Sequence, residues 1–212
     1  MEKGFIFMNI LETPRLILRN ANADDAPFML DLLNQPSFIR FIGDRGIRSL
    51  DGAREYIETR LVKSYKDNGF GLYITLLKEE NLPIGLCGLV KRDGLDDIDI
   101  GFAFLAQHES KGYGFESASA VMEYSKNTLG LKRIAGITTP DNEKSIGLLE
   151  KLGLKFEKMI KLPNDTEELK LFIRTLWREK YRKVASEKHN LFLRQAYLFV
   201  QPLWTIIFKS GV

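Results

Sequence analysis

The residues best suited to chemistry in this sequence lie in the segment ESKGYGFE, at positions 109–116. Gly112 and Gly114 have no Cβ atom, so the backbone can turn sharply there and come close to a ligand. The segment stands between a predicted strand and a predicted helix. Such a loop presents free N–H groups at a helix start, where the helix dipole also favours an anion. The segment therefore predicts a pyrophosphate site, and the alternative is a tight turn without a ligand.

Two well-known phosphate motifs do not account for this segment. The Walker pattern G-x-x-x-x-G-K-[ST] is absent from the sequence. A dinucleotide loop needs a third glycine, but Ser117 stands in its place. The preceding strand also belongs to a meander and does not open a βαβ unit. Both nucleotide folds are therefore disfavoured.

Hydrophobic periodicity and turn residues predict the strands and helices on either side of this loop. Alternating apolar residues predict strands at 15–19, 70–77, 84–90, 97–105, 132–139, 154–160 and 168–177. Helical patterns predict helices at 24–33, 51–66, 115–128 and 143–152. Asp24 and Asp51 are the expected N-caps of the first two helices, and Pro36 is expected to end the first.

The three strands predicted within residues 70–105 have no helix between them, which favours antiparallel pairing. In the last of them, alternation should place four apolar residues on one face: Ile98, Ile100, Phe102 and Phe104. Helical crossovers follow in the C-terminal half. The expected fold class is α/β, of the α+β type, with a mixed, mostly antiparallel central sheet and helices on both faces. Residues 1–178 are expected to form this one domain.

The charge balance argues against a nucleic-acid partner. The formal net charge is +3, but residues 179–212 hold six Lys or Arg and two acids, which gives +4. The other 178 residues therefore carry +3 minus +4, or −1. The basic character belongs to a C-terminal extension, and the predicted domain has no basic excess to bind phosphate backbones.

Cysteine and histidine are too scarce for a disulfide or a metal site. Cys87 is the only cysteine and lies in an apolar run, so it is expected to be an inert core thiol. His108 has no neighbouring Cys or His, and His189 lies in the extension. No metal is therefore expected. The N-terminus has no long apolar region with a cleavage site, so we expect a cytoplasmic protein.

Several separated segments together resemble the GNAT superfamily of N-acetyltransferases, and within it the ribosomal-protein-alanine group. They occur in the family's order and cover about residues 11–177. The matching segments are TPRLILR at 13–19, DIGFAFL at 99–105, the loop 107–116, KRI at 132–134, and the helix NEKSIGLLEKLGL at 142–154.

The resemblance implies acetyl-CoA as cofactor and a GNAT-like fold. It assigns the pyrophosphate to main-chain amides of the loop, with one lysine as a charge partner: Lys111, Gly112, Tyr113, Gly114 and Phe115. It places the thioester along Phe104 and Leu105, where a backbone N–H would stabilise the tetrahedral oxygen. Asn142 and Ser145 would complete the cofactor contacts.

The implied reaction is direct attack of a neutral primary amine on the thioester, in a ternary complex with the cofactor. Many relatives protonate the leaving thiolate with a Tyr, where this chain has Leu149, so Ser145 is the expected acid. Asp99 is the first candidate base and Glu116 the second. Each carboxylate has a structural alternative: solvated protection of a strand edge for Asp99, and interaction with the helix dipole for Glu116.

One departure from the family pattern concerns the loop. The family has Arg or Gln three residues before the first glycine, and this chain has Glu109, which must point away from a pyrophosphate. Leu149 and Glu109 together support an alternative function, a non-catalytic acyl-CoA-binding module. The acceptor groove is expected from residues 35–50 and 160–168, which carry both signs of charge.

The segment 191–208 holds thirteen apolar residues that no family motif explains. It contains Arg194 and Pro202, which argues against a membrane-spanning helix. Left in water it would form a large apolar patch, so we expect it to pack on its own domain or to form a homodimer. An interfacial membrane contact is the less favoured alternative.

Overall fold

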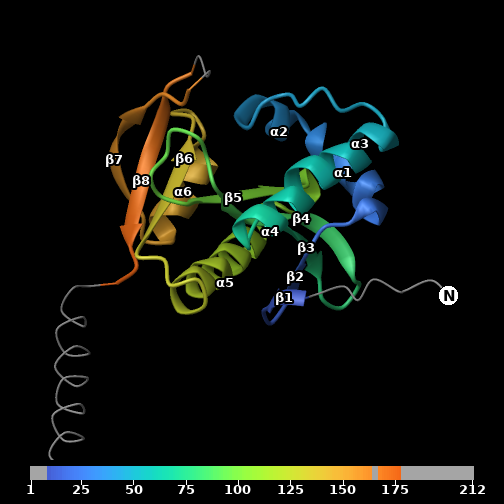
Figure 1. The fold of residues 1–212 in the computed structure, drawn as a ribbon, viewed down its shortest axis with the longest axis horizontal. Coiled ribbons are helices and arrows are strands. Elements are labelled where there is room, and N and C mark those ends of the chain that lie inside the picture. Colours follow the sequence, from blue (N-terminus) through green and yellow to red (C-terminus); the bar gives the residue numbers. More distant parts are fainter. Residues whose placement is uncertain (1–8, 164–166, 178–212) are drawn as a thin grey trace, which may run out of the picture. The chain divides into compact units, whose positions relative to one another are not determined.

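The computed structural model of the protein describes residues 9–163 and 167–177. They form one eight-stranded sheet with the order β1-β2-β3-β4-β5-β6-β8-β7 (Figure 1). The strands are β1 (Asn9–Glu12), β2 (Leu16–Arg19), β3 (Leu72–Leu77), β4 (Leu82–Val90), β5 (Asp99–Phe104), β6 (Arg133–Thr138), β7 (Lys155–Ile160) and β8 (Leu169–Thr175). Only β5 and β6 pair in parallel, so the predicted mixed, mostly antiparallel sheet is confirmed. The predicted extension, 179–212, lies outside the described residues.

Helices cover both faces of this sheet. The described α-helices are α1 (Ala26–Leu33), α2 (Pro36–Phe41), α3 (Leu50–Tyr56), α4 (Lys63–Asn68), α5 (Tyr113–Asn127) and α6 (Glu143–Lys151), and a π-helical segment, Ile57–Val62, joins α3 to α4. On β3, Tyr73 packs in the core under α5 and α6, and its neighbour Ile74 packs in the core under α1 and α3. No helix in the described part of the chain is long and apolar enough to cross a membrane.

The two caps expected in the N-terminal half are wrong. Asn22, not Asp24, caps the first helical turn, and Ser49, not Asp51, caps α3 by accepting the N–H of Gly52 at 3.1 Å. Both observed caps have extended backbones, with φ near −140°, which an N-cap residue requires. Sequence pattern does not reveal that backbone angle.

Two short elements were not expected from the sequence. Pro36 begins α2 and does not simply end α1, because a proline at the first helical position loses no helical hydrogen bond. β1 has only four residues and pairs at the sheet edge with β2. Four residues give too short an alternation to separate a strand from a loop.

The sheet opens between β5 and β6. Their parallel ladder has a single registered pair, Asp99 with Ala135, next to a bond of 2.9 Å from the Ala135 N–H to the Ile98 carbonyl. In a regular ladder the next N–H of β6, that of Ile137, would bond to a β5 carbonyl. Here it donates to Oδ1 of Asp99 at 3.3 Å. Beyond this point the two strands diverge (Figure 1).

A buried ion pair holds the carboxylate that ends the ladder. Asp99 is 1% exposed, and its Oδ2 lies 2.6 Å from Nε of Arg92, in the connection between β4 and β5. One oxygen therefore binds the arginine and the other binds β6. Asp99 lies where β5 and β6 separate, and its carboxylate takes the place of the β5 carbonyl that would otherwise accept the Ile137 N–H.

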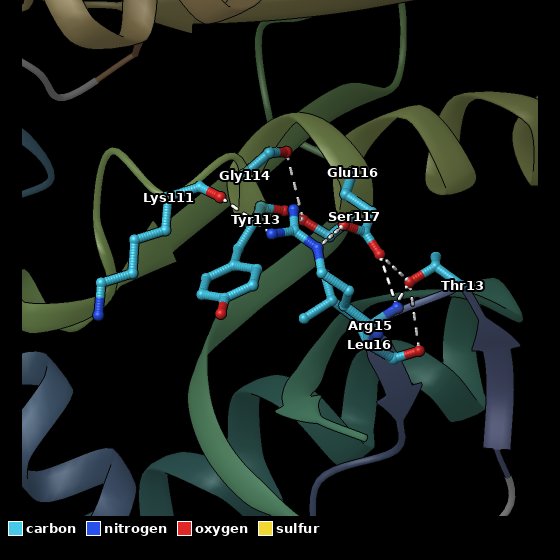
Figure 2. Close-up of polar contacts among 8 residues, drawn as sticks. All are labelled: Thr13, Arg15, Leu16, Lys111, Tyr113, Gly114, Glu116 and Ser117. Carbon is cyan, nitrogen blue, oxygen red and sulfur yellow. Dashed lines mark hydrogen bonds and ion pairs between the residues drawn. The ribbon is translucent and has the colours of Figure 1, made fainter. Parts of the chain in front are cut away.

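A second polar cluster fastens the start of α5 to the start of β2 (Figure 2). Oε1 of Glu116 accepts the Thr13 hydroxyl at 2.6 Å and the Arg15 N–H at 2.9 Å. Oε2 accepts Nε of Arg15 at 2.7 Å. The same guanidinium donates to the Lys111 carbonyl at 3.2 Å and lies 4.6 Å from the centre of the Tyr113 ring. The loop and the first turn of α5 are thus tied to residues about a hundred positions earlier in the chain.

Replacing Asp99 by alanine should lower the free energy of unfolding by about 2–4 kcal/mol, because Arg92 and the Ile137 N–H lose their acceptor. Arg92 is 31% exposed, so water offsets part of the loss. Asp97→Ala is the matched control, since it removes a more exposed pair with Arg133 at 3.2 Å and should cost less than about 1 kcal/mol. Urea denaturation measures both variants. Equal losses would contradict this role of Asp99.

The stabilisation by Glu116 should disappear in acid. Partial burial alone would raise the pKa of this carboxyl, but hydrogen bonds from Thr13 and Arg15 outweigh it and hold the pKa below its ordinary value. Such a group stabilises the fold fully above its unfolded pKa, about 4.3, and loses that contribution as the pH falls through the folded value. Glu116→Gln should therefore be about 1–3 kcal/mol less stable than wild type at pH 7, with a smaller difference below about pH 4.

Thermal or urea unfolding between pH 7 and pH 3.5 checks this expectation. Glu123→Gln, on the same helix, is the control, because Glu123 is exposed and its carboxylate accepts a single bond, from Asn127 at 3.0 Å. That variant should follow wild type at every pH. A Glu116→Gln deficit that does not change with pH would show that the charge of Glu116 is not what stabilises the fold.

Candidate active site

The loop after β5 ends in a helix start without a side-chain cap. Gly112 is the N-cap of α5, has φ 85°, and supplies no capping side chain. The first helical bond runs from the Glu116 N–H to the Gly112 carbonyl at 3.0 Å. The N–H groups of Tyr113, Gly114 and Phe115 precede that bond and have no acceptor within the helix. Amides of this kind at a helix start can bind an anion.

Gly114 lets three elements meet at this point. A Cβ atom there would lie 3.3 Å from Cδ2 of Leu148 on α6 and 3.5 Å from Cε2 of Phe104 on β5. Any larger side chain would push the start of α5 away from the end of β5. The absence of a side chain therefore keeps the free amides next to the opening between β5 and β6.

The open edge of β5 presents backbone groups to this gap. Leu105 donates its N–H to the Ile84 carbonyl of β4 at 2.9 Å, so that amide is occupied. Backbone direction alternates along a strand, so the N–H and C=O groups of Phe102 and Phe104 point the other way, toward β6. No registered pair with β6 extends that far. Of the two amides predicted to stabilise an oxyanion, the one of Phe104 faces the gap.

On the other side of the gap, Asn142 and Ser145 begin α6. Oδ1 of Asn142 accepts the Ser145 N–H at 3.1 Å, which makes Asn142 the N-cap. Ser145 is half-buried, and its hydroxyl has no hydrogen-bond partner among the described residues. Leu149, which stands where many relatives carry a Tyr, is 1% exposed and packs where a Cβ on Gly136 would lie only 2.5 Å away. It is a core residue.

The two carboxylates predicted as bases, Asp99 and Glu116, each form an ion pair with an arginine. Burial raises the pKa of Asp99, against the influence of Arg92, and this carboxyl lies inside the sheet. Glu116 is fixed by Thr13 and Arg15, as described above. The geometry thus gives each of them a structural task. Hydrogen-bond partners from distant segments leave no trace in the local sequence, so the motif alone could not separate these tasks from catalysis.

Glu109 turns toward α6. Its Oε2 lies 2.7 Å from Nζ of Lys144, in the first turn of that helix. The sequence prediction did not include Lys144. Its position two residues after Asn142 was the available signal, since that turn was already expected at the cofactor site.

The two segments expected to form the acceptor groove meet at an open cavity of about 600 Å³. Arg40 comes from α2, Asp141 from the turn after β6, and Glu167 and Glu168 from the turn before β8. Arg40 and Asp141 pair across it at 2.9 Å. Besides that pair, Glu168 adds a negative charge to the rim.

The described residues hold no group of three or more His, Cys, Asp or Glu side chains placed to bind a metal ion. Cys87 is fully buried, and burial raises the pKa of its thiol to about 12, so it is not a nucleophile at neutral pH. The described groups at the opening are main-chain amides, a serine hydroxyl and the charged rim.

Comparison with known proteins agrees with this arrangement. Residues 15–155 match the family described as acetyltransferase (GNAT) domain. The chain is similar to the uncharacterized N-acetyltransferase YoaA of Bacillus subtilis (strain 168), with 30% identity over 154 residues, which cover 72% of this chain and 86% of that protein.

Two solved structures share the fold. RimL, a ribosomal L7/L12 alpha-N-protein acetyltransferase in complex with coenzyme A, has a TM-score of 0.68 at 16% identity, covering 79% of this chain and 98% of that one. The ribosomal-protein-S5-alanine acetyltransferase from Vibrio fischeri has a TM-score of 0.61 at 19% identity, covering 79% and 98%. Both come from the ribosomal-protein group that the sequence segments resemble. Because the family match spans more than half of the chain and the fold agrees with it, this protein belongs to the GNAT acetyltransferases, which take their acetyl group from acetyl-CoA.

Proposed function

We propose that the protein transfers an acetyl group from acetyl-CoA to a primary amine, on a protein N-terminus or a small molecule, by direct attack in a ternary complex. The proposal rests on two neighbouring features at one edge of the sheet: the opening between β5 and β6, and the cavity that follows β6. β5 and β6 are parallel, so their C-terminal ends lie at the same edge. The free amides of α5 follow β5, and the acidic cavity follows β6. A donor held at the opening can meet an acceptor held at the cavity.

The chain offers the donor an anion site and a polar strand edge. The amides of Tyr113, Gly114 and Phe115 would hold the diphosphate, with exposed Lys111 beside them. The outward-facing groups of Phe102 and Phe104 would bond to the amide arm of the cofactor much as a neighbouring strand would. When bound, acetyl-CoA supplies an acetyl thioester at this edge.

Three groups would then serve the chemical step. The Phe104 N–H would stabilise negative charge on the thioester oxygen as the amine attacks. The Ser145 hydroxyl would give a proton to the departing thiolate. Since Asp99 and Glu116 are engaged with arginines, the proton of the attacking amine would pass to a water near Asp141 at the mouth of the cavity.

The rim of the cavity supports an amine as acceptor. Glu168 adds negative charge, and Arg40, the one base among the described lining residues, is paired with Asp141. An ammonium group approaching this rim is attracted before it loses its proton. One of the two structural neighbours is by name an alpha-N-protein acetyltransferase and the other a ribosomal-protein-S5-alanine acetyltransferase, which supports a peptide acceptor as the first to test.

The wild-type protein should bind acetyl-CoA saturably in calorimetry and release free thiol from it when a suitable amine is present. The amine panel should include peptides with free N-termini, polyamines and small primary amines, with an N-acetylated peptide as the negative control. Binding without thiol release across the panel would favour the alternative, a non-catalytic acyl-CoA-binding module, which Leu149 in place of a tyrosine supports. Absence of binding would refute both.

Ser145→Ala should lower kcat by about 10- to 100-fold, because water is a poorer donor of the proton to the thiolate. The Kd for acetyl-CoA should change by less than about twofold, since the Asn142 cap and the α5 amides remain. Ser119→Ala, on α5, is the matched control and should keep wild-type kcat. Equal kcat values for Ser145→Ala and wild type would remove Ser145 from the reaction.

A further inference from the structure

An ion pair bridges the loop before α5 and the first turn of α6. Glu109 lies three residues before Gly112 and is 26% exposed, while Lys144 is 77% exposed. Their charged atoms are 2.7 Å apart, although the residues are 35 positions apart in sequence. The pair therefore joins the two sides of the opening into which the diphosphate would enter.

One face of α6 lies along the first turn of α5 and carries two cations. Lys144, Leu148 and Lys151 are spaced four and three residues apart, so they share this face. Leu148 lies 3.3 Å from where a Cβ of Gly114 would be, and Nζ of Lys151 lies 4.5 Å from the centre of the Phe115 ring. Lys144 continues this row toward the loop. Its ammonium group is thus within reach of an anion on the free amides of α5.

We propose that Lys144 is a binding residue for the cofactor diphosphate, and that it forms an ion pair with Glu109 when the cofactor is not bound. This inference rests on the proposed function. A diphosphate on the α5 amides would bring negative charge next to the Glu109 carboxylate, which is unfavourable while both remain unpaired. Transfer of Lys144 from Glu109 to a phosphate oxygen keeps the lysine paired and lets the carboxylate turn to solvent.

The exchange is physically easy because the Lys144 side of the pair is largely exposed. Exposed ion pairs shift an equilibrium by no more than about fivefold. Lysine has a flexible four-carbon stem and needs no fixed hydrogen-bond geometry. A phosphate group on the preorganised amides offers a stronger partner than a single solvated carboxylate. Glu109 should therefore act as an internal competitor that weakens cofactor binding.

A double-mutant cycle with Glu109→Gln and Lys144→Gln tests the exchange, using coenzyme A as the probe in calorimetry. Glu109→Gln should tighten binding about threefold to fivefold, because Lys144 is released. Lys144→Gln should weaken binding about threefold to tenfold, because a charged phosphate contact is lost. In the Lys144→Gln background, the gain from Glu109→Gln should be smaller than in wild type, since no lysine is left to release.

The sign of this coupling decides between two roles for Lys144. If the lysine only neutralises Glu109 and stays with it when the cofactor binds, the gain from Glu109→Gln would be larger without Lys144, and the proposal would be overturned. Dephospho-coenzyme A should show the same coupling as coenzyme A, because it keeps the diphosphate. Loss of the coupling with that probe would refute the diphosphate assignment.

Lys66→Gln is the matched control. Lys66 forms an exposed pair with Glu58 at 3.0 Å, on the helical segment that ends in α4, and its removal should leave the Kd unchanged. A wild-type protein that does not bind coenzyme A would refute the proposed function itself. Wild-type binding with identical Kd values in all variants would refute only the role of Lys144.

Discussion

β5 and β6 form one registered pair and then separate, and the rest of the site depends on that separation. Two parallel strands would normally continue to exchange hydrogen bonds, and unpaired main-chain groups inside a sheet are costly. The carboxylate of Asp99 resolves this conflict. It accepts the Ile137 N–H from β6 and is held by Arg92, so β6 can leave β5 without losing its first acceptor. The groups left open on β5 face the gap, where a ligand can bond to them.

A ligand could bond to the open edge of β5 and to the amides of α5 at once only if those amides stay beside the separated strands. α5 could pivot about its contacts with the sheet, but Glu116 ties its first turn to Thr13 and Arg15 at the start of β2. Gly114 then allows the turn to touch both β5 and α6. Residues about a hundred positions apart thereby fix a few main-chain amides at the mouth of the opening. Under the proposed function, these backbone amides and Lys144 bind the diphosphate, and Glu116 and Gly114 serve to place the amides.

Charge around the opening is arranged mostly as pairs. Asp99 with Arg92 and Glu116 with Arg15 are partly or fully buried and hold the framework. Glu109 with Lys144 and Arg40 with Asp141 are more exposed, the first beside the loop before α5 and the second at the open cavity. Surface pairs are weak enough to be exchanged for a ligand, whereas buried ones are not. Burial therefore separates the structural ion pairs from those that a ligand can open.

Most of the sheet, the helix after the glycine loop and the loop's suitability for an anion could be predicted from the sequence alone. Hydrophobic alternation, helical period and glycine positions are local properties of the chain. It also placed Ile98, Ile100, Phe102 and Phe104 on one face, and all four pack in the core under α5 and α6. The roles of the charged residues, in contrast, depend on the folded structure. The partners of Asp99, Glu116 and Glu109 come from other segments, so neither their burial nor their ion pairs can be inferred from neighbouring residues. The roles of those carboxylates follow from long-range packing, which cannot be predicted from local sequence patterns.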